Sequence, residues 1–220
     1  MLIIFDLDNT LIDRDAAFLL CLKGMFQQQG CDFQIVDIEN VKIQDDSGRN
    51  DRAELCEYLS RKYPMLGLSS DEVWRCFQCL PAHVVKNHSV NAMLARLSRD
   101  YTLCLLSNGS SSMQRRKLVN AGIEHLFSDI FISGELGISK PDIAIFEHVL
   151  ERYDVSACDC IMVGDDPVRD IEPAKKIGLC SIWLDKNVEV GIPENRGIGT
   201  YHHQINHIKD VEKAILRCLT

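Results

Sequence analysis

Short segments with the apolar, β-branched character of buried strands recur along the chain and constrain its fold more than any other feature. They lie at residues 2–7, 102–107, 129–133, 160–164 and 180–184. Helical patterns separate the later segments, at residues 110–121, 141–153 and 167–177. Strands that alternate with helices predict a parallel sheet, because each parallel connection must cross back over one face of the sheet. We therefore expect an α/β fold with a doubly wound parallel sheet.

The first two strand segments break this rhythm, since about ninety residues separate them. One crossover does not need so long a connection. The intervening stretch has helical periodicity of its own, at residues 15–29, 51–62 and 71–79. We therefore predict an α-helical cap subdomain at residues 14–88, inserted into a core formed by residues 1–13 and 89–220.

The C-terminal part of the chain has weaker patterns. The stretch from Val188 to Thr200 is rich in glycine and is expected to be irregular. A final helix is predicted from about Ile205 to Leu219.

Polar residues follow the predicted strands at the points where the strands end. In an open parallel sheet, ligands bind beyond the carboxyl ends of the strands, so these side chains are expected to gather at one edge. Another polar residue, a lysine, lies just ahead of the helix that leads into the fourth strand. The set comprises Asp6, Asp8, Thr10, Ser107, Asn108, Lys140, Asp165, Asp166 and Asp170.

Carboxylates crowded at a buried strand end repel one another and need a compensating cation. Mg²⁺ suits such a site because it accepts one or two carboxylates together with waters and a phosphate oxygen. The remaining groups fit phosphoryl transfer, in which Ser107 and Lys140 could hold phosphoryl oxygens. One carboxylate could then attack phosphorus, as it does in aspartyl-phosphate enzymes.

Four motifs in this order resemble those of the haloacid dehalogenase-like hydrolases, specifically the phosphatase branch with a helical cap inserted after the first motif. They are FDLDNT at residues 5–10, LLSN at 105–108, the lysine of SKPD at 139–142 and GDDPVRD at 164–170. The resemblance covers roughly residues 1–13 and 90–185. It implies a Rossmann-like core, a Mg²⁺ cofactor and a phosphatase activity.

The resemblance also implies roles for residues near the first strand. Asp6 would be the nucleophile and a Mg²⁺ ligand, together with the backbone carbonyl of Asp8 and the side chain of Asp165. Asp8 would protonate the leaving group and then activate water. Thr10 would fix the loop after the first strand through a bond to a neighbouring carboxylate.

The resemblance also implies that the other three motifs form the phosphate site. Ser107, Asn108 and Lys140 would bind the phosphoryl group. Asp170 would orient Lys140 or act through a metal-bound water. The family often has a small polar residue at the position of Asp166. The resemblance therefore implies only a supporting role for Asp166, without direct contact with the metal.

The expected function is hydrolysis of a phosphomonoester, with a small phosphorylated metabolite of the nucleotide or sugar phosphate type as substrate. The acid at position 8 favours phosphate over halide chemistry, because a departing halide needs no proton. A phosphomutase of the same fold remains an alternative, as does a non-catalytic binding or regulatory module. The cap would select the leaving group.

Net charge bears on the partners. The chain has 24 Lys plus Arg against 32 Asp plus Glu, a formal net charge of −8. Such an acidic protein is a poor partner for a nucleic acid polymer or an anionic membrane, so we expect neither. The N-terminus resembles neither a signal peptide nor a membrane anchor, so we expect a cytoplasmic protein. We make no prediction of its oligomeric state.

The ten cysteines are scattered through a chain long enough to fold without disulfides, and reduced thiols are expected. Cys76 and Cys79 form a Cys-x-x-Cys pattern within a helical stretch. No strand precedes it and no second pair accompanies it, so buried thiols are expected there.

Two groups of cationic residues are expected to have ordinary surface roles. Arg14, Arg49 and Arg52 are expected to be exposed, although each could reach an anionic substrate. The histidines of the C-terminal part are expected to be solvated, namely His202, His203 and His207.

Overall fold

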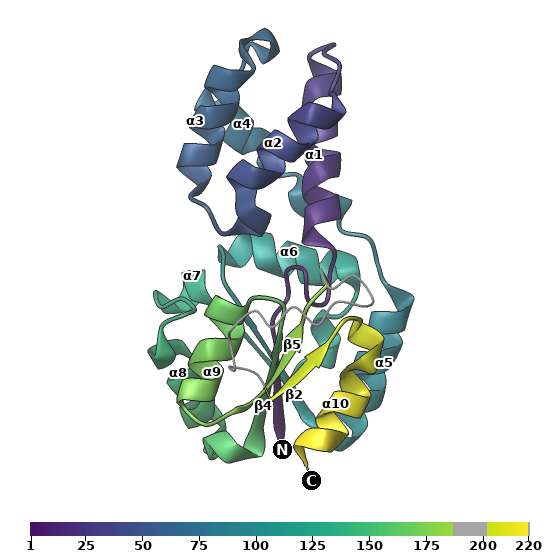
Figure 1. The fold of residues 1–220 in the computed structure, drawn as a ribbon, viewed down its shortest axis with the longest axis vertical. Coiled ribbons are helices and arrows are strands. Elements are labelled where there is room, and N and C mark those ends of the chain that lie inside the picture. Colours follow the sequence, from purple (N-terminus) through teal and green to yellow (C-terminus); the bar gives the residue numbers. More distant parts are fainter. Residues whose placement is uncertain (187–201, 220) are drawn as a thin grey trace. The chain divides into compact units, whose positions relative to one another are not determined.

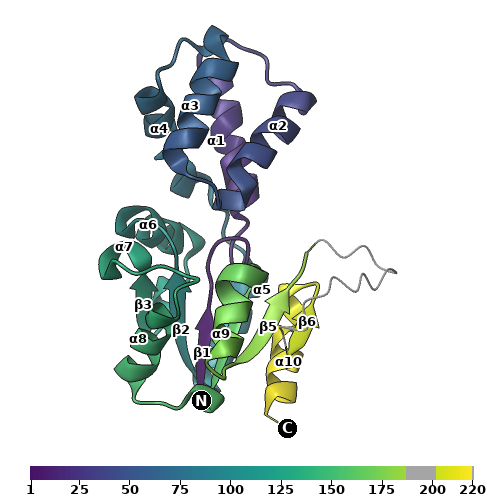
Figure 2. The ribbon, with the colours of Figure 1, turned by 60° about the vertical axis from the view of Figure 1, so that its left-hand side comes forward.

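The computed structural model describes residues 1–186 and 202–219. Its centre is a parallel sheet, whose strands are labelled between Figures 1 and 2, with the order β3-β2-β1-β4-β5-β6. The α/β class and the doubly wound sheet are thus confirmed. The strands are β1 Leu2–Phe5, β2 Thr102–Ser107, β3 Asp129–Ile132, β4 Cys160–Gly164, β5 Cys180–Leu184 and β6 His203–Ile205.

Helices cover both faces of this sheet. Figures 1 and 2 show α8 and α9 on one side and α5 and α10 on the other. Leu2 and Ile4 of the central strand pack into the same core cluster as Phe146 of α8. Ile3 and Phe5 alternate with them and are also buried, as expected for a strand between two helical layers. The helices are α5 His88–Asp100, α6 Ser111–Ala121, α7 Ser133–Leu136, α8 Ile143–Tyr153, α9 Glu172–Lys176 and α10 Val211–Cys218.

Contacts divide the chain into two compact units, one of Met1–Ile12 with Lys86–Thr220 and the other of Asp13–Val85. The second unit is helical and has its own apolar core, in which Phe18 stacks on Phe77 with ring centroids 5.2 Å apart. Its role as a cap stays a prediction. Its helices are α1 Arg14–Gln28, α2 Ile35–Asp45, α3 Arg52–Lys62 and α4 Ser70–Phe77.

Local capping residues set the ends of several helices. The side chains of Asp13 and Asp51 accept hydrogen bonds from the first turns of α1 and α3. Ser69 and Glu72 form a reciprocal capping box at the start of α4. Gly122 ends α6 with φ of 67°, a left-handed conformation that glycine adopts without steric cost.

Several predicted elements differ from the structure. The predicted helix 167–177 begins with a π-helical turn, Pro167–Ile171, because Pro173 lacks the N–H that a continuous α-helix would need. The C-terminal helix begins at Val211 rather than at Ile205, since residues 203–205 form the unpredicted strand β6. Helix α2 lies outside the helical stretches that the sequence predicts. The predicted irregular stretch from Val188 to Thr200 lies outside the described residues.

Three predictions about side chains are wrong. Cys180 of β5 and Cys218 of α10 form a disulfide, so the expectation of reduced thiols fails for this pair. Cys79 is exposed rather than buried. Arg14 is buried, because its guanidinium donates to the carboxylate of Asp45 inside the helical unit.

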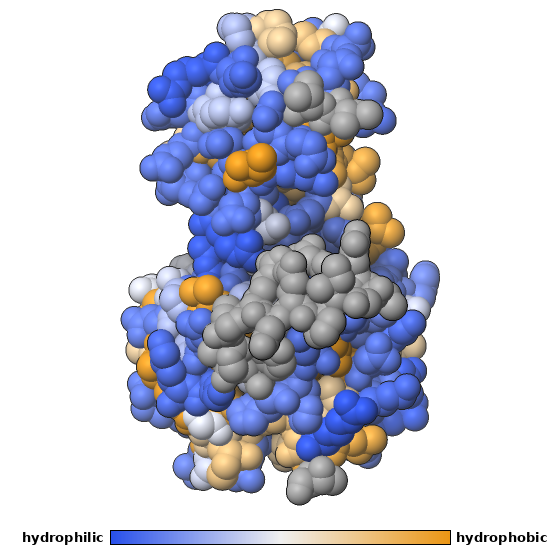
Figure 3. Space-filling view, in the orientation of Figure 1, coloured by the Kyte–Doolittle hydropathy of each residue, from blue (hydrophilic) through white to orange (hydrophobic). Residues whose placement is uncertain are grey.

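Hydrophilic residues cover most of the face shown in Figure 3, in keeping with a chain of which 25% is charged. Within residues 1–186 and 202–219, no helix is both long and apolar enough to cross a bilayer.

Candidate active site

The carboxyl ends of three adjacent strands bring the predicted site residues together. Asp6 follows β1, Ser107 ends β2 and Asp165 follows β4. Because β1 pairs with β2 on one side and β4 on the other, these three positions lie at neighbouring strand ends. The predicted clustering at this edge of the sheet is therefore seen in the structure.

Lys140 lies between two buried carboxylates. Its Nζ donates to Asp6 Oδ1 at 2.7 Å and to Asp170 Oδ1 at 2.6 Å. All three residues are at most 6% exposed. Burial acts to lower the pKa of Lys140, but Asp170 and Asp6 outweigh it and raise that pKa. The lysine is therefore held as an ammonium group, aimed at the residue predicted to be the nucleophile.

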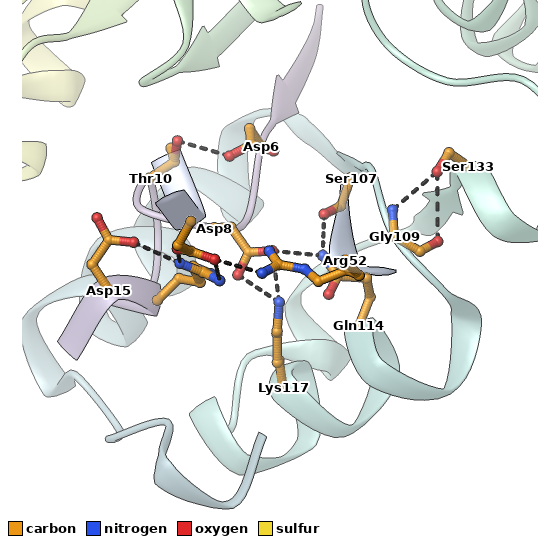
Figure 4. A network of polar contacts seen from close by, with 12 residues as sticks. Asp6, Asp8, Thr10, Asp15, Arg52, Ser107, Gly109, Gln114, Lys117 and Ser133 are labelled. Atoms are coloured by element: carbon orange, nitrogen blue, oxygen red, sulfur yellow. Dashed lines mark hydrogen bonds and ion pairs between the residues drawn. The ribbon is translucent and has the colours of Figure 1, made fainter. Parts of the chain in front are cut away.

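Thr10 links two carboxylates of the site. Its Oγ1 lies 3.0 Å from Asp6 Oδ2 (Figure 4). The same oxygen lies 3.1 Å from Asp165 Oδ1 and accepts from the backbone N–H of Asp165 at 3.0 Å. A hydroxyl has one proton, so it donates to one of the two carboxylates at a time. Thr10 thus fixes the loop after β1 against the loop after β4.

The buried carboxylates have an electrostatic cost. Burial, followed by repulsion from Asp6 and Asp170, raises the pKa of Asp165 well above its ordinary value. Burial likewise raises the pKa of Asp170 to about 7, against the opposing effect of Lys140. Asp6, Asp165 and Asp170 each place an oxygen within 4.8 Å of the others. This all-oxygen donor set fits a hard divalent cation, which would relieve the repulsion.

Asp8 has a different set of partners, drawn from α6. Its carboxylate accepts from Lys117 Nζ at 2.8 and 2.7 Å and from Gln114 Nε2 at 2.9 Å (Figure 4). Gln114 Nε2 also donates to Ser107 Oγ at 2.6 Å. The side chain of Asp8 is 24% exposed, whereas that of Lys117 is 7% exposed. Asp8 therefore keeps access to solvent while Lys117 and Gln114 of α6 fix its orientation.

Gln114 and Lys117 are not among the site residues predicted from the sequence. The available signal was their position on α6, where they share the buried face with Leu118 and Ala121. Polar residues on the apolar face of a helix require buried partners, and this pattern could have drawn attention to them.

Asn108 has its side chain committed to the backbone of Lys140. Its Nδ2 donates to the Lys140 carbonyl at 2.8 Å, and its Oδ1 accepts from the Lys140 N–H at 2.9 Å. The adjacent Gly109 N–H donates to Ser133 Oγ at 3.0 Å (Figure 4). The side chain of Asn108 thus fixes the backbone of Lys140, while the second N–H of its amide stays available for a phosphoryl oxygen. The predicted phosphate-binding role of Asn108 stays a prediction.

The loop after β4 depends on Asp166 and Gly164. The Asp166 carboxylate accepts from the N–H groups of Val168 and Arg169, and its own N–H donates to Asp170 Oδ2 at 3.2 Å. A Cβ atom at position 164 would lie 2.2 Å from that same Asp170 oxygen. Only glycine lets Asp170 approach the strand closely enough to reach Lys140.

Comparison with known proteins places this arrangement in a family. The family model described as haloacid dehalogenase-like hydrolase matches residues 3–184. The chain belongs to the haloacid dehalogenase-like hydrolase family. This family membership confirms the resemblance read from the four motifs. The match to the family model covers both the strand ends that carry the site and the helical insertion.

The chain is also similar to individual proteins that are named as hydrolases or phosphatases. HAD-hydrolase YfnB of Bacillus subtilis is 26% identical over 234 residues, covering 97% of each chain. Phosphoserine phosphatase of Thermus thermophilus is 42% identical over 96 residues, 44% of this chain and 39% of that enzyme. Mouse N-acylneuraminate-9-phosphatase is 35% identical over 109 residues, 49% and 44% of the two chains. The chain thus spans less than half the length of these two phosphatases.

The fold is also that of solved family members. The crystal structure of YfnB, bound to magnesium, superposes with a TM-score of 0.78 over 98% of each chain at 21% identity. A phosphatase of Thermococcus onnurineus gives a TM-score of 0.66 at 22% identity, over 97% of this chain and 96% of that one. At these identities the likeness concerns the fold.

Proposed function

We propose that this protein is a Mg²⁺-dependent phosphomonoester hydrolase that acts through an aspartyl phosphate on Asp6. The observation that carries the proposal is the buried cluster of Asp6, Asp165 and Asp170 around the Lys140 ammonium group. Relatives named as phosphoserine, N-acylneuraminate-9-phosphate and glyceraldehyde 3-phosphate phosphatases support it. We further propose a small phosphorylated metabolite as the substrate.

The carboxylates of Asp6 and Asp165, with the backbone carbonyl of Asp8, would hold Mg²⁺. Bound there, Mg²⁺ would offset the carboxylate repulsion and stabilise charge on the phosphoryl oxygens. Asp170 is engaged by Lys140 and by the N–H of Asp166, so its main part is to position the lysine.

In the first step, a carboxylate oxygen of Asp6 attacks phosphorus in line with the leaving oxygen. The bond from phosphorus to the leaving oxygen breaks, and Asp8 donates a proton to the departing alkoxide. Ser107 and Lys140 bind oxygens of the transferring group, where their charge and hydrogen bonds favour the transition state.

In the second step, Asp8 as carboxylate removes a proton from water, and that water attacks the phosphorus of the aspartyl phosphate. The bond between phosphorus and Asp6 breaks, which releases inorganic phosphate and regenerates Asp6. Asp8 can serve both steps because, unlike Asp6, its side chain is partly exposed, so that protons can exchange with solvent.

A direct test measures phosphate released from a panel of phosphomonoesters with Mg²⁺, with a chelator, and with Ca²⁺. We expect activity with Mg²⁺, none with the chelator, and little with Ca²⁺, whose looser coordination would misalign Asp6. Asp6→Asn should be inactive. Full activity in chelator would refute the metal requirement, and isomerised rather than hydrolysed sugar phosphates would favour a phosphomutase.

A further inference from the structure

A second group of metal-binding side chains lies within the helical unit Asp13–Val85. The Cys-x-x-Cys pattern of residues 76–79 looked isolated in the sequence, but the fold brings Cys21 of α1 and His83 next to Cys79. One ligand atom from each of Cys21, Cys79 and His83 lies within 4.8 Å of the other two. Cys21 is buried and Cys79 is exposed, so the cluster extends from the helical core to the solvent.

The distances within this cluster can be compared with two bonded states. Cys79 Sγ lies 3.6 Å from His83 Nε2, and Cys21 Sγ lies 3.0 Å from Cys79 Sγ. Tetrahedral zinc, with bonds of about 2.3 Å to sulfur and about 2.0–2.1 Å to nitrogen, separates sulfur from nitrogen by about 3.5–3.6 Å and two sulfurs by about 3.8 Å. A disulfide needs sulfurs about 2.05 Å apart. The sulfur-to-nitrogen distance matches zinc, and the sulfur-to-sulfur distance lies between the zinc and disulfide values. A disulfide would use only the two cysteines, whereas zinc would also bind His83.

We propose that Cys21, Cys79 and His83 form a Zn²⁺ site with an open fourth position. Two thiolates and an imidazole are soft and borderline donors, which suit Zn²⁺ and exclude Mg²⁺. Binding displaces the thiol protons of Cys21 and Cys79 to solvent while His83 binds through neutral Nε2. Because zinc displaces these protons, its affinity should increase with pH.

The site would fasten the helical unit. Cys21 lies on α1, the first helix of the unit, and His83 ends the turn Leu80–His83, its last element. A metal shared by these elements closes a long loop of chain and should stabilise the folded unit, as other long-range links do. The Cys21 thiol now donates to the carbonyl of Cys76 at 3.1 Å; that carbonyl also accepts from the Cys79 N–H and would stay satisfied.

The test titrates Co²⁺, a spectroscopic substitute for zinc, into the full-length protein after reduction and removal of metals. We expect one equivalent of Co²⁺ to give a sulfur-to-cobalt charge-transfer absorption with tetrahedral visible bands, and Zn²⁺ to abolish both. The all-oxygen site around Asp6 cannot give the sulfur absorption, so the two sites are distinguishable. Cys79→Ser and His83→Gln should each weaken binding by more than about 100-fold, the largest loss that changes to outer-shell partners usually cause.

Two matched thiol controls complete the design. Cys56→Ser, at a buried thiol on α3 of the same unit, should keep the absorption. Cys218→Ser should also keep it, although Cys180, Cys218 and His203 lie close together. Absence of the absorption in reduced protein would overturn the proposal, and so would its loss only in Cys218→Ser. A Cys21–Cys79 disulfide in a protein that binds no Co²⁺ after reduction would replace the zinc site with a redox pair.

Discussion

At the scale of single residues, two aspartates only two positions apart have different surroundings. Asp6 is buried and contacts Lys140 and Thr10, whereas Asp8 is partly exposed and contacts Lys117 and Gln114. Different environments allow neighbouring carboxylates to serve as nucleophile and as acid or base. Their proposed roles therefore lead to separate predictions.

Asp8→Asn should separate the two chemical steps. With an alkyl phosphate, whose departing alkoxide needs a proton, turnover should fall about 10²–10⁴-fold. With an aryl phosphate of an acidic phenol, transfer to Asp6 should persist while hydrolysis of the aspartyl phosphate slows. Stopped-flow absorbance should then show a burst of about one phenol per enzyme.

Asp6→Asn is the control for this experiment and should give no burst. Equal losses on alkyl and aryl substrates without a burst would remove the acid and base role from Asp8. It would then be chiefly a metal-site residue.

Lys117→Met tests whether the ammonium group orients Asp8. Lys117 contacts both carboxylate oxygens, and its loss would free the side chain of Asp8 to rotate. We expect kcat to fall up to about 10²-fold, the effect of misplacing a catalytic group by about 1 Å, with little change in KM. Lys176→Met, at an exposed lysine, should have no effect. A lower melting temperature with normal kcat would instead assign Lys117 to stability.

Asp165→Asn tests the electrostatic cost of the site. The raised pKa of Asp165 means that the folded state favours its protonated form. Protonated Asp165 therefore contributes its full stabilisation of the folded state below the ordinary pKa of about 3.8. This stabilisation is lost as the pH rises through the folded-state pKa. Without metal, the variant should therefore melt above the wild type at neutral pH, and this advantage should shrink in acid.

Mg²⁺ should raise the melting temperature of the wild type more than that of Asp165→Asn. Asp32→Asn, at an exposed aspartate, is the matched control and should follow the wild type. A variant that melts below the wild type at neutral pH without metal would show that Asp165 has a structural role.

At the scale of elements, three helices of the inserted unit meet at one carboxylate. Asp45, the last residue of α2, accepts from Arg14 at the start of α1 and from Arg52 at the start of α3. Asp45 and Arg14 are both at most 3% exposed. Burial makes this ion pair expensive to form, but removing one partner is more expensive, since it leaves a buried charge unpaired.

Asp45→Asn should therefore destabilise the helical unit by about 3–5 kcal/mol. Asp46→Asn is the matched control, because Asp46 pairs with Arg49 at the surface and asparagine tolerates its left-handed conformation. That change should cost less than about 1 kcal/mol. Hydrogen exchange of the α1–α3 amides measures both, and equal effects would contradict the burial argument.

At the scale of the whole molecule, the chain leaves the unit that contains the sheet after β1 and returns to it before α5. The proposed catalytic residues all belong to the unit that contains the sheet, and their proposed contacts are with the phosphoryl group and the metal. Recognition of the leaving group is therefore assigned, as a proposal, to the inserted helical unit.

Arg49→Ala should test that assignment. Loss of this arginine should lower kcat/KM for large substrates more than for a small aryl phosphate, because the binding energy of a remote group is lost only when that group is present. Arg61→Ala, at an exposed arginine of the same unit, should change neither. Equal losses on large and small substrates would place Arg49 in folding rather than in recognition.

The sequence alone determined the sheet and most of the strand-end positions. Apolar strand segments and the helices between them are local patterns, and the carboxyl ends of parallel strands meet at one edge by topology. Asp6, Ser107 and Asp165 could therefore be assigned to one site without coordinates. The strand β6 could not be predicted, because three residues are too few to show the alternation of apolar and polar residues that marks a strand.

Only the tertiary structure decided which distant side chains meet. Lys117 reaches Asp8 across 109 positions, and Cys21 reaches Cys79 across 58. The Cys180–Cys218 disulfide likewise depends on the docking of α10 beside β5. No local period encodes such pairs, because their geometry depends on how whole helices pack against distant elements, and that packing is set by the complete core.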